Sequence, residues 1–171
     1  MKPAVYKIFG ATAVLAVLLT GCGGDDTDPD SGDPAPRAIP ASIAVAAASD
    51  AALMGTYASS TIALNEVTKF NPVGGDPETC RFRFAGLQQA GTTRLMDGDI
   101  RYVPGTTELR VAFASISGTE FRIQGTGGVF VDKPNNRVVF TNAVLTSTQG
   151  SGNTITLTGA IPMLGNRPEG C

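Results

Sequence analysis

The chain has 171 residues, of which 16% are charged, and its formal net charge at pH 7 is −2. It holds no histidine, no tryptophan and three cysteines, whereas its 21 glycines are about twice the usual share. Without histidine it has no Ser-His-Asp triad, Cys-His pair or histidine metal site, and its near-neutral charge argues against nucleic-acid binding. We expect one domain, with no cofactor and no metal.

The N-terminus has the pattern of a targeting signal. Two lysines and no acid precede an apolar run, IFGATAVLAVLL, at residues 8–19. This run is shorter than the roughly 20 residues of a membrane span and has the length of a signal-peptide core. Leu19-Thr20-Gly21-Cys22 follows it directly. Residues 1–22 therefore resemble a bacterial lipoprotein signal with its lipobox. The alternative is an ordinary secretory signal followed by an unrelated cysteine.

The lipoprotein resemblance implies that the signal peptide, residues 1–21, is removed and that acylated Cys22 anchors the protein in a membrane. Several acyl chains anchor a protein stably, whereas one does so only marginally. In this family an aspartate directly after the lipidated cysteine tends to retain the protein in the inner membrane, and here Gly23 stands at that place. The resemblance implies the cell envelope, on the outer membrane, and leaves its periplasmic or surface face open.

A short acidic segment follows the lipobox. Residues 23–37, GGDDTDPDSGDPAPR, hold five aspartates, one arginine and almost no apolar side chain. Such a segment cannot bury enough surface to offset its ordering entropy. We therefore expect a flexible acidic tether over residues 22–37 and a single β-domain over residues 38–171. The five acids and one base of residues 23–37 give a net charge of −4, and the domain holds ten acids and ten bases.

Two cysteines remain once Cys22 is assigned to the lipid. In an oxidising compartment Cys80 and Cys171 have only one intramolecular pairing, and we expect a disulfide between them. Two free thiols are the alternative. Upstream of Cys80, the alanine-rich residues 38–54 suit a helix, with a short turn capped by Ser49 or Asp50, and equally suit an edge strand. Both readings stay open.

From residue 56 onward the sequence indicates strands. Five segments alternate apolar and polar side chains, which is typical of strands with one buried face: residues 80–84, 99–103, 108–113, 120–124 and 154–158. Residues 129–131 and 137–145 add two apolar strands, and short turns separate all of these segments. Because such connections force antiparallel neighbours, we predict an all-β fold, an antiparallel meander of about seven to nine strands forming a small barrel or sandwich. The phenylalanines expected in its core are Phe82, Phe84, Phe113, Phe121, Phe130 and Phe140.

The opening of this region favours the barrel. Leu53-Met54-Gly55-Thr56-Tyr57 faintly resembles the Gly-x-Trp start of lipocalin-like barrels. The resemblance covers these five residues and departs at Tyr57, where the family has tryptophan. It implies a barrel and transfers no ligand site.

The candidate binding face consists of arginines on outward strand positions: Arg81, Arg83, Arg101, Arg110 and Arg122, with Arg137 in the same pattern. One interpretation is a cationic strip for a phosphate, a lipid or an acidic polymer. The other is a solvated face balanced by neighbouring acids. The glycine-rich residues 125–128 suggest a phosphate cradle, but no helix follows them as such a cradle requires, so a hairpin turn is the better interpretation.

These features support three hypotheses of function. The first is a non-enzymatic, membrane-anchored β-domain that binds or scaffolds an envelope protein or polymer. The second is a lipocalin-like carrier of a lipid or small hydrophobic ligand. The third, least favoured, is a hydrolase in which Asp97, Asp99, Glu108 or Glu120 converge in a cleft. We assign no catalytic residue.

Overall fold

The computed structural model describes residues 32–71 and 77–171 of the chain. The predicted signal peptide, the predicted lipidated Cys22 and the tether as far as residue 31 lie outside the described residues. No helix among the residues described is both long enough and apolar enough to span a membrane.

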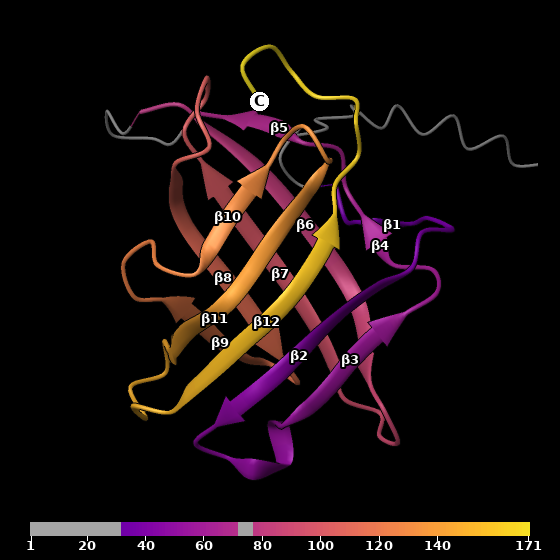
Figure 1. Ribbon diagram of the computed structural model, residues 1–171, viewed down its shortest axis with the longest axis vertical. Helices are drawn as coiled ribbons and strands as arrows, with labels where there is room; N and C mark the ends of the chain where they lie inside the picture. Colours follow the sequence, from indigo (N-terminus) through magenta and orange to yellow (C-terminus); the bar gives the residue numbers. More distant parts are fainter. Residues whose placement is uncertain (1–31, 72–76) are drawn as a thin grey trace, which may run out of the picture.

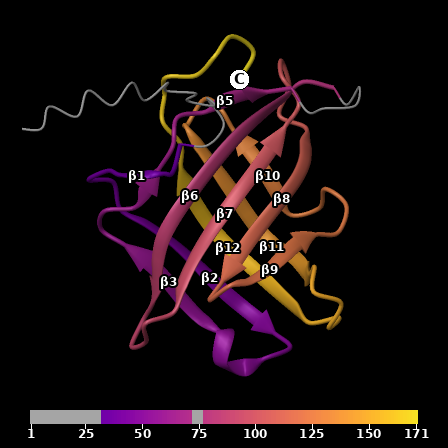
Figure 2. The same ribbon diagram turned by 180° about the vertical axis from the view of Figure 1, so that it is seen from behind.

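Eight antiparallel strands close into a barrel, as Figures 1 and 2 show from opposite sides. The elements are β1 (Ala35–Pro36), β2 (Ala41–Ala48), the 3-10 turn η1 (Ala51–Leu53), β3 (Gly55–Ser59), β4 (Ala63–Leu64), β5 (Thr68–Phe70), β6 (Thr79–Gln89), β7 (Leu95–Tyr102), β8 (Leu109–Ile116), β9 (Thr119–Ile123), β10 (Val129–Asp132), β11 (Arg137–Ser147) and β12 (Thr154–Pro162). The barrel strands β2, β3, β6, β7, β8, β9, β11 and β12 each pair with the next, and β12 pairs with β2 to close the ring. The prediction of an antiparallel all-β meander is confirmed, as a barrel and not a sandwich.

The remaining strands extend two of the barrel strands. β4 and β5 continue the line of β3 along β6, and β10 continues the line of β9 along β11. β1 pairs with β4, so residues within the predicted tether already belong to the sheet. The Arg83 guanidinium donates a hydrogen bond to the Gly32 carbonyl, which holds this entering segment against β6.

Residues 38–54 contain both a strand and a helical turn, but the strand is not the edge strand that the sequence allowed, because it pairs with both β3 and β12. Ala41–Ala48 form β2, and Ala51–Leu53 form a 3-10 turn. The side chain of Asp50 caps this turn by accepting a hydrogen bond from the Ala52 N–H at 2.9 Å. The alanines thus lie first in a barrel strand and then in a single helical turn.

The interior of the barrel is filled by the side chains of the chain itself. Tyr57, Tyr102, Phe82, Phe84 and Phe121 are all buried to within 1% exposure. Aliphatic side chains from the barrel strands other than β3, which contributes Tyr57, surround them. An eight-stranded barrel is just wide enough for its own side chains to fill it.

Two phenylalanines predicted for the core face outward instead. A β-bulge at Arg110 shifts the pairing of β8 with β7, so that the alternation reverses after Leu109. Ala112 therefore points inward, while Phe113 points outward and is only partly covered. Phe130 is 52% exposed because Val129 and Val131 on either side of it occupy the interior. Phe82, Phe84, Phe121 and Phe140 are buried as predicted.

The last residues of the chain cover one end of the barrel (Figure 1). The predicted disulfide is confirmed: Cys80 on β6 bonds to Cys171, with their Cα atoms 5.6 Å apart. The buried Tyr102 hydroxyl donates to the Cys171 carbonyl at 3.0 Å, and burial raises the pKa of Tyr102 to about 12. Lys133 donates to the Gly170 carbonyl at 2.8 Å. In the chain-entropy model, closing a loop of this size stabilises a fold by about 4–5 kcal/mol.

Candidate binding face

The arginines of β6 and β7 lie side by side on the outside of the barrel. In the register of the two strands, Arg81 lies directly opposite Arg101, and Arg83 lies directly opposite Asp99. Two like charges directly opposite each other destabilise a sheet unless a counter-charge lies between them. The sequence places that counter-charge two residues from Arg101, on the same face of β7.

Asp99 forms ion pairs with both of these arginines. Its carboxylate lies 2.9 Å from Arg81 Nη2 and 3.0 Å from Arg101 Nη2. The side chains of Asp99 and Arg81 are only 18% and 14% exposed. Partial burial strengthens such charge-assisted hydrogen bonds. One carboxylate against two guanidinium groups leaves the cluster with an excess positive charge.

Two outward phenylalanines separate the guanidinium groups. The Phe70 ring lies 5.8 Å from Arg81 Cζ and 5.4 Å from Arg101 Cζ. The Phe113 ring lies 5.9 Å from Arg101 Cζ and 5.8 Å from Arg122 Cζ. These distances are within the range of cation–π interactions. We call this set, Phe70, Arg81, Asp99, Arg101, Phe113 and Arg122, the arginine face.

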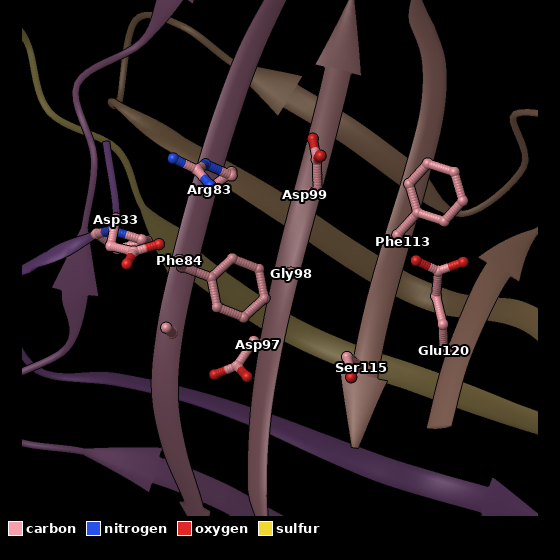
Figure 3. A pocket seen from close by; sticks show the side chains of 11 residues that line it. Asp33, Arg83, Phe84, Asp97, Gly98, Asp99, Phe113, Ser115 and Glu120 are labelled. Atoms are coloured by element: carbon pink, nitrogen blue, oxygen red, sulfur yellow. The ribbon is translucent and has the colours of Figure 1, made fainter. Parts of the chain in front are cut away.

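A shallow groove of about 270 Å³ lies next to the arginine face and is drawn in Figure 3. Its carboxylates are Asp33, Asp97, Asp99 and Glu120. Three of them accept hydrogen bonds from nearby groups: Asp97 from the Gly86 N–H at 2.9 Å, Glu120 from the Thr148 hydroxyl at 3.1 Å, and Asp99 from the arginines. Glu108 does not line this groove. The carboxylates proposed for a hydrolase are thus only partly brought together, and those three bond to groups of the barrel itself.

The five predicted arginines separate into three groups. Arg81, Arg101 and Arg122 belong to the arginine face. Arg83 is bound to the entering segment, and its Nε is buried without a hydrogen-bond partner in the described part of the chain. Arg110 lies with Arg122 in a second pocket, beyond the arginine face. Arg137, the sixth outward arginine, pairs with Asp132 at 2.8 Å.

The sequence did not reveal the aromatic part of this face. Phe70 precedes a stretch without clear alternation. Phe113 has the spacing of a core residue in the sequence, and only the bulge at Arg110 turns it outward. The counter-charge could be predicted in part, because Asp99 and Arg101 are two residues apart and so lie on the same face of one strand. Its partnership with Arg81 depends on the register of β6 against β7, which the sequence alone does not give.

No group of three or more metal-binding side chains occurs within residues 32–71 and 77–171. Comparisons of the chain with models of protein families, with curated proteins and with solved structures find no match.

Proposed function

We propose that this protein is a non-enzymatic lipoprotein of the cell envelope, anchored by lipid on Cys22, whose barrel binds an envelope protein or polymer through the arginine face. The observation that carries the proposal is the contrast between the two sides of the barrel wall. The inside is occupied by apolar side chains of the chain itself, whereas the outside presents three guanidinium groups stacked against two phenylalanine rings. Arginine and aromatic side chains are enriched where proteins bind partners.

The proposed anchor suits this role. Lipid on Cys22 holds the protein at the bilayer, and the acidic residues of the tether repel anionic head groups. The barrel is thereby kept away from the membrane surface, where its outer wall is accessible to a partner. We expect Cys22→Ser to move the protein from the membrane fraction to the soluble envelope fraction.

The other two hypotheses receive less support. A carrier needs an apolar cavity, and in this barrel Tyr57, Tyr102 and Phe82 occupy the interior with no measurable exposure. A hydrolase needs an acid and a base that face one substrate. Asp97 and Glu120 instead accept hydrogen bonds from groups of the barrel itself.

The proposal is tested by site-specific photo-crosslinking in intact cells. A photoreactive residue at Ser115 lies beside the arginine face, and one at Ala47 lies on β2, across the barrel. We expect a discrete crosslinked product from position 115 only, and we expect Arg122→Glu to abolish it. Equal products from both positions, or none from either, would contradict binding through this face.

A further inference from the structure

The barrel wall is interrupted between β8 and β10. β8 pairs with β9 only from Phe113 to Ile116, and in the described part of the chain β10 pairs with β11 alone. The first half of β8, residues 109–112, therefore has no ladder partner on this side. Residues 124–128, which connect β9 to β10, lie at the interruption.

A pocket of about 400 Å³ occupies this place. It is lined by Arg110, Val111, Arg122 and residues 123–126. The bulge of β8 sets Arg110 outward, and the alternation of β9 does the same for Arg122. Two guanidinium groups that are twelve residues apart in sequence therefore border one pocket.

These two arginines differ from the other arginines of the outer wall. Arg81 and Arg101 pair with Asp99, and Arg137 pairs with Asp132. Neither Arg110 nor Arg122 has an ion pair or a side-chain hydrogen bond with any residue that the structure describes. The Phe113 ring, 5.8 Å from Arg122 Cζ, holds that guanidinium in place without using its N–H donors. The pocket therefore has an excess of positive charge and unused donors.

The turn after β9 lies beside the same two arginines. Residues 123–126 line the pocket, so the peptide groups of this turn and the side chain of Thr126 border it. Gly125 has φ of +74°, a conformation that favours glycine and lets the backbone turn beside the arginines. Backbone N–H groups at such turns are common ligands of anions.

We propose that this pocket binds a phosphoryl group. Two guanidinium forks can donate several N–H groups to a tetrahedral dianion, and this geometry favours phosphate over a single carboxylate. The inference rests on the proposed function, because Arg122 belongs to the arginine face, and it names the chemistry that this end of the face recognises. The phosphoryl group belongs either to a soluble phosphate compound or to a lipid head group.

Isothermal titration of the full chain in detergent tests the soluble source, with pyrophosphate as the probe and malonate as a dicarboxylate control. We expect pyrophosphate to bind and malonate to bind at least about tenfold more weakly. Arg110→Ala and Arg122→Ala should each lower pyrophosphate affinity about tenfold or more, and Arg122→Lys should restore only part of it. Arg37→Ala removes an exposed arginine outside the pocket and should leave the affinity unchanged.

Nanodiscs of phosphatidylglycerol, compared with phosphatidylcholine, test the lipid source with the same variants, each made in a Cys22→Ser chain that lacks the proposed lipid anchor. Binding to phosphatidylglycerol nanodiscs alone, lost in Arg110→Ala, assigns the phosphoryl group to a lipid. Wild-type protein that binds neither probe, or variants that bind as wild type does, would overturn the inference. If position 115 still gives its crosslinked product in that case, the phosphoryl site fails while the proposed function stands.

Discussion

At the scale of single residues, the wall of the barrel depends on how a few side chains meet across strands. Gly98 on β7 lies opposite Phe84 on β6, and the Phe84 ring lies against it inside the barrel wall (Figure 3). A Cβ atom at position 98 would lie 2.3 Å from Phe84 Cε1. The glycine is therefore required by the ring, and the ring in turn covers the backbone that the glycine leaves bare.

We expect Gly98→Ala to destabilise the protein by about 1–3 kcal/mol, the usual cost of overpacking a core. Adding Phe84→Leu should recover part of this loss, because the smaller side chain makes room for the new methyl group. Urea unfolding of the single and double variants measures both effects.

Gly127→Ala is the matched control for this substitution. A Cβ atom there meets no other atom within 4 Å, and the φ of Gly127 is not positive. We expect no more than a small change in stability. A Gly98→Ala protein as stable as the control would show that the contact with Phe84 is relieved at no cost.

At the scale of elements, β-bulges decide which side chains reach the outer face. The sequence predicted the antiparallel order, most strand positions and the inward set of β6, β7, β9 and β12, because alternation is a local property. It did not predict the bulge at Arg110, which depends on pairing with β7 and reverses the orientation of Phe113. The arginines of the arginine face were therefore predicted from the sequence, whereas its two phenylalanine rings were missed.

The β10–β11 hairpin is held by an ion pair and hydrogen bonds to the Asp132 carboxylate. The Arg137 guanidinium at 2.8 Å and the Asn135 amide at 2.9 Å hydrogen-bond to the Asp132 carboxylate. These two hydrogen bonds, the one from Arg137 having the larger effect, hold the pKa of Asp132 below its ordinary value. The charged carboxylate therefore stabilises the folded state above the ordinary pKa, and this contribution is lost as the pH falls through the folded pKa.

We expect Asp132→Asn to lower the free energy of unfolding at pH 7, and the difference from wild type to shrink as the pH falls below about 4. Arg137→Gln removes the same ion pair from the other side and should show the same pH dependence. Urea unfolding at a series of pH values measures it. A difference that stays constant down to about pH 2 would show that Asp132 acts through its shape and not its charge.

At the scale of the whole molecule, the barrel has a filled interior, one end covered by the final segment, and an outer wall that presents the arginine face. The disulfide of Cys80 and Cys171, with the bond from the Tyr102 hydroxyl, holds the final segment over one end. The interior is occupied by aromatic and aliphatic side chains. The proposed recognition surface is the outer wall, where the arginine face adjoins the pocket lined by Arg110 and Arg122.

Native mass spectrometry of the full chain released from its own membrane tests most directly whether the barrel binds with its outer wall and not its interior. We expect the protein to have the mass of the polypeptide with the proposed acyl chains, or any further bound molecule to be lost in Arg122→Glu. A hydrophobic molecule bound in a one-to-one ratio and retained by Arg122→Glu would place the ligand inside the barrel and contradict binding through the outer wall.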